Sequence, residues 1–185
     1  MATVRAGNQC VLIVVDVQVG VMKDCINATQ TIAKVARTVE RARAAHVPIL
    51  WVQHENDELK RDCDEWQWVP ALVPSAGETR VYKQFNSAFE QTDVDALLAK
   101  TGATHIVLAG AQSNWCIRAT AYGALERGYD LTLVKDAHTT SDLDLGDGTK
   151  IDAATIVRDL NVTIKWLEYP GRRNAISAAE DVVFV

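Results

Sequence analysis

The chain of 185 residues is long enough for one domain with a sizeable core, and we treat residues 1–185 as a single domain. With 48% hydrophobic and 23% charged residues, its composition is that of a globular protein and excludes a disordered or fibrous chain. A net charge of −5 gives the protein no electrostatic attraction to nucleic acid or to an anionic membrane, so we expect neither as a partner.

The chain also lacks the usual targeting and membrane signals. Its longest apolar run, residues 10–15, is far too short to cross a bilayer, and residues 1–9 do not have the pattern of a signal peptide. We therefore expect a cytoplasmic protein. Its four cysteines form no C-x-x-C pair, and in a reducing compartment they are expected to be free thiols: Cys10, Cys25, Cys63 and Cys116.

Strand and helix signals alternate along the chain. Predicted strands are short apolar or β-branched runs at 10–15, 49–52, 80–83, 106–108, 131–134 and 162–166. Predicted helices have amphipathic spacing and occupy 29–45, 93–100, 114–127 and 152–160, with a possible short helix at 175–179.

This alternation predicts a doubly wound, three-layer α/β/α fold with a mostly parallel sheet. In such sheets the functional crevice lies outside the carboxyl ends of the strands. Residues 54–79 are the longest irregular stretch, and we interpret them as a lid, a pocket wall or a subunit contact.

Three residues with reactive side chains follow three different predicted strands. Asp16 follows the first strand, Lys83 the third, and Cys116 lies in the first helical turn after the fourth. A helix N-terminus and a nearby ammonium both favour a thiolate, and a carboxylate can act as general base and acid. Each residue also has an ordinary interpretation, as a buried thiol, a turn cap and a surface lysine, so the spacing alone is suggestive.

Three sequence blocks resemble the signature blocks of the isochorismatase-like cysteine hydrolases. They are VLIVVDVQVG (11–20), VYKQFNSAFEQT (81–92) and AGAQSNWCIRATAYGALERGYDLTLVKDAHTT (109–140). Their order and spacing match, and the similarity extends from residue 10 to about residue 160.

The resemblance implies that Asp16, Lys83 and Cys116 form a catalytic triad. It further implies a non-proline cis peptide between Ala111 and Gln112, with the N–H groups of Gln112 and Cys116 forming an oxyanion hole. A homodimer or homotetramer is implied as well, and no cofactor.

The resemblance also leads to expectations about the pocket. We expect Gln18, Trp66, Trp68 and Phe89 to contact the substrate. Nicotinamidases of this family bind a metal through Asp-x-His and a second His, but this chain has only His54 in that region, so we expect no metal site. His54 and His138 are interpreted as structural residues.

The expected function is hydrolysis of an amide-type C–N bond in a small molecule through a thioester. The substrate is an amide, a carbamoyl or ureido compound, or a lactam, with a streptothricin-type lactam as one possibility. Two alternatives remain open: hydrolysis of a vinyl ether, as in true isochorismatases, and a catalytically silent binding member of the family.

Overall fold

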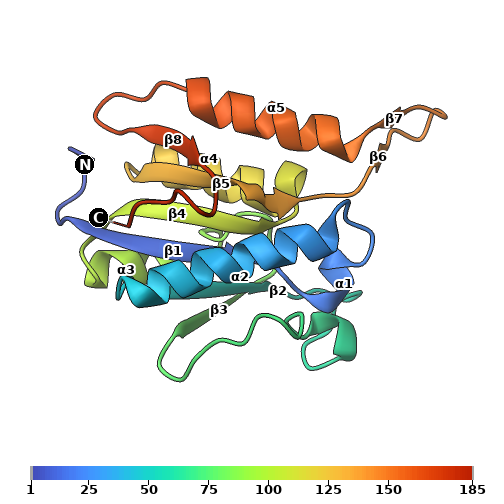
Figure 1. Ribbon diagram of the computed structural model, residues 1–185, viewed down its shortest axis with the longest axis horizontal. Coiled ribbons are helices and arrows are strands. Elements are labelled where there is room, and N and C mark those ends of the chain that lie inside the picture. The colour runs from blue at the N-terminus through green and yellow to red at the C-terminus, as the bar shows by residue number, and fades with distance from the viewer. Residues whose placement is uncertain (1, 185) are drawn as a thin grey trace.

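The computed structural model describes residues 2–184, which fold around one six-stranded parallel sheet with strand order β3-β2-β1-β4-β5-β8 (Figure 1). All five ladders between neighbouring strands are parallel. The strands are β1 (Gln9–Val15), β2 (Ile49–His54), β3 (Thr79–Lys83), β4 (Ala103–Ala111), β5 (Asp130–Thr139) and β8 (Asn174–Ser177). A separate hairpin of β6 (Leu143–Asp144) and β7 (Lys150–Ile151) projects from the body.

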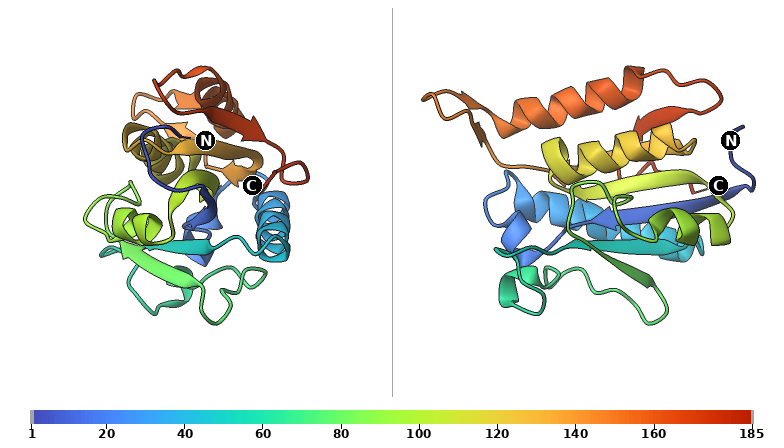
Figure 2. Two further views of the ribbon diagram at one scale, coloured as in Figure 1. Left: turned by 90° about the vertical axis from the view of Figure 1, so that its left-hand side faces the viewer. Right: turned by 180° about the vertical axis from the view of Figure 1, so that it is seen from behind.

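Helices cover both faces of the sheet (Figure 2), as the alternation of elements predicts. One apolar core lies between the sheet and α2, and the other lies between the sheet and α3, α4 and α5. The helices are α1 (Val19–Met22), α2 (Ala28–Ala44), η1 (Asp64–Trp66), α3 (Val94–Lys100), η2 (Ser113–Ile117), α4 (Arg118–Glu126) and α5 (Ala153–Trp166).

The first strand shows why the two-sided core follows from the sequence. Successive side chains of a strand point to opposite faces. Val11, Ile13 and Val15 therefore enter the core under α3–α5, while Leu12 and Val14 enter the core under α2. Both faces are buried, so the sequence of this strand is one continuous apolar run.

Two predictions for the last part of the chain are wrong. Residues 162–166 form the end of α5 rather than a strand, because Ile156, Leu160 and Ile164 continue one apolar helix face into the core. The sixth strand is β8, where a short helix was expected at 175–179, and it pairs with β5. Strands β4 and β5 are also longer than predicted, since both extend to the functional edge.

The strand order reverses between β1 and β4, and this is where the carboxyl ends separate. Gly110, near the end of β4, has φ +130°, and a Cβ there would lie 2.0 Å from the Val15 carbonyl oxygen. Only glycine allows β4 to approach β1 this closely. In residues 2–184 we find no helix with the length and apolar character needed to cross a membrane.

Candidate active site

A cavity of about 740 Å³ opens at the carboxyl ends of the strands, at the end of the molecule where α1 lies (Figure 1). Asp16, Gln112 and Cys116 contribute to its lining, together with residues of α1 and of the loop after β2. Residues 54–79 therefore form a pocket wall, which was one of the three interpretations of this stretch.

The structure brings Asp16, Lys83 and Cys116 into direct contact. Lys83 Nζ lies 2.6 Å from Asp16 Oδ2 and 3.2 Å from the Cys116 sulfur. The Asp16 and Lys83 side chains are almost fully buried, at 1% and 0% exposure. Apart from Lys83 and the Cys116 thiol, no residue in the described part of the chain satisfies the Asp16 carboxylate.

Each of the three residues is held by the end of a strand. Asp16 follows β1 directly and has φ 51°, a left-handed conformation that aspartate tolerates better than most residues. Lys83 is the last residue of β3 and pairs in register with His54 at the end of β2. Cys116 lies in η2, the turn that joins β4 to α4, and the Ala111–Gln112 peptide bond before it is cis.

The charge of Lys83 depends on its neighbours. Burial by itself lowers the pKa of the ammonium, but the negative charge and hydrogen bond of Asp16, with a smaller contribution from Cys116, outweigh it. The pKa of Lys83 is therefore raised above its ordinary value, and the side chain is a permanent cation at neutral pH.

The protonation state of the Cys116 thiol is set by opposing influences. Burial, followed by the nearby Asp16 carboxylate, raises the pKa of Cys116 to about 12, although Lys83 acts in the opposite direction. The helix N-terminus and the ammonium favour a thiolate, but desolvation outweighs them in this structure. At neutral pH the thiol keeps its proton, and a base must remove it before it can attack.

His54 also contacts this cluster. Its Nδ1 lies 3.3 Å from Lys83 Nζ, and burial together with the Lys83 charge lowers the pKa of the imidazole. The ring is therefore neutral at pH 7, and its Nδ1 accepts a hydrogen bond from Lys83. In the part of the chain that the structure describes, no group of three or more His, Cys, Asp or Glu side chains is placed to hold a metal ion.

The expected contact of Gln18 with substrate is wrong, because its side chain is fully buried and ties two segments together. Its amide exchanges hydrogen bonds with the backbone of His54, at 3.0 and 2.9 Å, and donates to the Trp66 carbonyl at 2.8 Å. Gln18 therefore fixes the end of β2 and the loop after it relative to α1.

The three aromatic residues expected in the pocket also lie elsewhere. Trp66 is buried against Tyr82, with ring centroids 5.7 Å apart, and Trp68 packs edge-on against Trp51 at 5.0 Å. Phe89 is buried beside Tyr129 in the core. Aromatic type alone does not distinguish a pocket wall from a core position.

The sequence interpretation missed several residues that do line the cavity. Trp115, which precedes the nucleophile, is 47% exposed and lies at the cavity. Glu58 and Glu65, in the loop after β2, line it too. The adjacency of Trp115 to Cys116 was the one signal in the sequence that pointed to the first of these residues.

Behind the cavity, His138 fixes the turn that contains Cys116. Its Nδ1 lies 2.8 Å from Ser113 Oγ, and its Nε2 lies 3.1 Å from Asn161 Oδ1. Burial lowers the pKa of His138 to about 4, so the ring is neutral and joins the first residue of η2 to α5. His138 is thus structural, as expected.

Comparisons with known proteins agree with this architecture. The family model described as the isochorismatase domain matches residues 10–159. A streptothricin hydrolase of Streptomyces noursei is 32% identical over 142 residues, which cover 71% of this chain and 50% of that protein. A maleamate amidohydrolase of Pseudomonas putida is 34% identical over 89 residues, which cover 48% of this chain and 39% of that protein.

The chain thus spans about half or less of the length of these two relatives. Among solved structures, a protein of Pseudomonas putida KT2440 described as an isochorismatase has a TM-score of 0.84 at 25% identity. The alignment covers 95% of this chain and 90% of that one.

Proposed function

Because the chain belongs to the isochorismatase family, we propose that it hydrolyses an amide-type C–N bond in a small molecule, with Cys116 as nucleophile. The observation that carries this proposal is the buried Asp16–Lys83 ion pair in contact with the Cys116 thiol at the cavity. The names of two relatives, a streptothricin hydrolase and a maleamate amidohydrolase, support a C–N bond as the target.

In the first half of the reaction, Asp16 accepts the thiol proton while the Cys116 sulfur attacks the substrate carbonyl carbon. The carbonyl oxygen becomes an oxyanion, for which we propose the backbone N–H groups of Gln112 and Cys116 as donors. Asp16 then gives the proton to the leaving nitrogen, the C–N bond breaks, and an amine or ammonia departs. A thioester on Cys116 remains.

In the second half, Asp16 accepts a proton from water, and the hydroxide formed attacks the thioester. The C–S bond breaks, the carboxylic acid leaves, and the proton returns to the Cys116 sulfur. Lys83 keeps the carboxylate oriented and balances the negative charge that moves between Asp16 and the sulfur. A thiol with a pKa of about 12 needs this base, because few thiolates exist at neutral pH.

A second candidate is cleavage of a vinyl ether, which the description of the similar solved structure as an isochorismatase favours. That reaction needs proton transfer by Asp16 but no sulfur nucleophile. The contact of the thiol with Lys83 supports the amide reaction over this candidate.

The test is release of ammonia or amine from a panel of amides, ureido compounds and lactams by the wild type and by Cys116→Ala. We expect turnover in the wild type and a loss of at least about 10³-fold in the variant, because the covalent route is gone. Cys63→Ala is the matched control, since Cys63 is a free thiol that does not line the cavity. Rapid quenching followed by intact-mass measurement should detect the acyl group on Cys116.

Turnover of amides that persists in Cys116→Ala would contradict the nucleophilic role. Vinyl ether cleavage in both proteins, with no amide turnover, would favour the second candidate. Absence of turnover on every compound would favour a silent binding member of the family.

A further inference from the structure

The charged residues at the mouth of the candidate active site are mostly acidic. Three exposed carboxylates line the cavity, those of Asp24, Glu58 and Glu65, against the single ammonium of Lys23. The Asp16–Lys83 pair is neutral as a unit, so the lining has a formal surplus of two negative charges.

These carboxylates differ from the acidic side chains of the surface that form ion pairs. Glu55, Glu78, Asp159 and Glu180 all form ion pairs with arginine. In residues 2–184, by contrast, no lysine, arginine or histidine lies within ion-pair distance of Asp24, Glu58 or Glu65. Their charge is therefore available to a ligand in the cavity.

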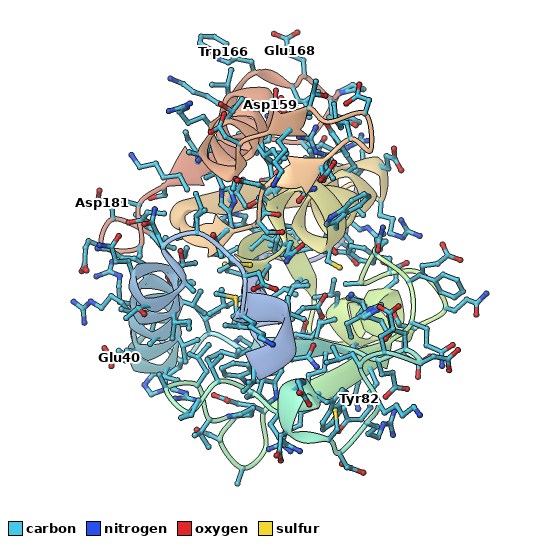
Figure 3. The ribbon with its side chains drawn as sticks, turned by 90° about the vertical axis from the view of Figure 1, so that its right-hand side faces the viewer. Glu40, Tyr82, Asp159, Trp166, Glu168 and Asp181 are labelled. Carbon is cyan, nitrogen blue, oxygen red and sulfur yellow. The ribbon has the colours of Figure 1, made fainter. Side chains whose placement is uncertain are left out.

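The wall that holds two of these carboxylates is fixed in place. Gly20 of α1 lies so close to η1 that a Cβ there would come within 2.8 Å of the Glu65 Cβ. On the other side, Tyr82, labelled in Figure 3, packs against Trp66 and under the Arg61 guanidinium at 4.1 Å. The loop 55–78 is therefore held against α1 and β3, which places Glu58 and Glu65 at the cavity.

An aromatic face completes this arrangement. Trp115 precedes the nucleophile and is 47% exposed at the cavity. The face of an indole ring attracts cations, most strongly where water is partly excluded. Carboxylates beside an aromatic ring are a combination suited to an ammonium or guanidinium group.

The size of the cavity agrees with a substrate that extends beyond its reacting bond. About 740 Å³ is far more space than a simple primary amide fills. A substrate with its carbonyl at Cys116 therefore has room for a further group at the acidic mouth.

Building on the proposed function, we propose that the substrate is an amide or lactam that also contains a protonated amine or guanidinium group. The carbonyl lies at Cys116, and the cation lies among Glu58, Glu65, Asp24 and Trp115. The negative lining raises the local concentration of such molecules and repels amides that bear a carboxylate.

The test uses three amides of similar length that differ in the charge of the far end: 6-aminohexanamide, 6-hydroxyhexanamide and adipamate. For the wild type we expect kcat/KM to fall in that order, with the cation at least about tenfold above the anion at low salt. The ratio should shrink severalfold at 0.5 M NaCl, because exposed charges are screened.

Variants of the lining residues show which charges cause the preference for the cationic amide over the anionic one. Glu58→Gln with Glu65→Gln should reduce the ratio of cation to anion to about threefold or less. Lys23→Gln should increase it, since it removes the one opposing charge. Asp57→Asn is the matched control, because Asp57 is in the same loop but does not line the cavity, and it should leave the ratio unchanged.

Binding separates this inference from the proposed reaction. The affinity of Cys116→Ala for the three amides, measured by calorimetry, should follow the same order even if the wild type hydrolyses none of them. Equal affinities, a preference for adipamate, or a preference that survives in the Glu58→Gln, Glu65→Gln double variant would overturn the inference, whatever the outcome for hydrolysis.

Discussion

Two cavities lie at opposite ends of the same sheet, and the larger one has the less reactive lining. The amino-end cavity has a volume of about 960 Å³, and its lining includes His105, Asp130, Arg172 and Arg173. The Asp130 carboxylate pairs with Arg173, and the Arg172 guanidinium donates to two backbone carbonyls. His105 lies 2.8 Å from the Thr132 hydroxyl.

The carboxyl-end cavity is smaller, but its groups are in a different state. It has a buried ion pair in contact with a protonated thiol, together with carboxylates that form no ion pair within the described residues. At the amino end, the charged side chains of Asp130, Arg172 and Arg173 interact with other groups of the protein. At the carboxyl end, the carboxylates at the cavity can interact with a ligand. The candidate active site is therefore indicated by the state of the groups that line each cavity, rather than by the volume of the cavity.

The largest expected effect comes from changing Asp16 to Asn, which is isosteric and tolerates the same left-handed backbone. We expect turnover to fall by about 10²–10⁴-fold, because the base is lost. The same change removes a charge that raises the pKa of Cys116, so the thiol should titrate below its wild-type value of about 12. Iodoacetamide alkylation of Cys116 across pH, followed by peptide mapping, measures this shift.

Asp16→Asn should lower turnover and at the same time make the Cys116 thiol more acidic, and this combination makes the test specific. A structural defect would lower turnover without making the thiol more acidic. Turnover that rises with the thiolate population in Asp16→Asn would show that Asp16 is not the base, and the contrast between the two ends of the sheet would weaken.

A smaller effect is expected on stability from Gly110→Ala, which alters the edge where β1 and β4 separate. A methyl group there meets the Val15 backbone in a conformation that L-residues rarely adopt, so we expect a loss of about 3 kcal/mol or more. Gly77→Ala is the control, because Gly77 also has positive φ, at +90°, but has no atom within 4 Å of its missing Cβ. Urea unfolding of both variants gives the comparison, and equal losses would show that the close approach is not limiting.

Much of the fold could be predicted from the sequence because a parallel strand buried on both faces leaves a continuous apolar run. This held for β1 and β2, and the three catalytic candidates follow because carboxyl ends of parallel strands share one edge. The prediction failed at 162–166, where Val162 and Trp166 are β-formers on the exposed face of a helix. Local propensity was outweighed there by the burial of Ile164, which lies one turn after Leu160 in the same apolar stripe.

The pocket wall could not be predicted in the same way. Trp66 and Glu65 are neighbours in sequence, yet one is buried and the other lines the cavity, because the short η1 turn points them in different directions. The raised pKa of Cys116 depends on burial, which one sequence does not report. The cytoplasmic location and the homodimer or homotetramer stay predictions.

The smallest effect concerns His138, the buried ring behind the cavity. Its pKa is lowered to about 4 in the folded protein, against 6.5 for an ordinary histidine. The unfolded chain therefore gains a proton first as pH falls, so stability is lost between about pH 6.5 and 4, by roughly 1.4 kcal/mol per pH unit at most.

We expect the wild type to lose about 2 kcal/mol from this source between pH 7 and pH 5. His138→Gln should lack that part of the loss while starting from a lower stability at pH 7, because its contacts with Ser113 and Asn161 change. Chemical unfolding at both pH values decides the matter, since parallel pH profiles for wild type and His138→Gln would mean that another group controls the acid sensitivity.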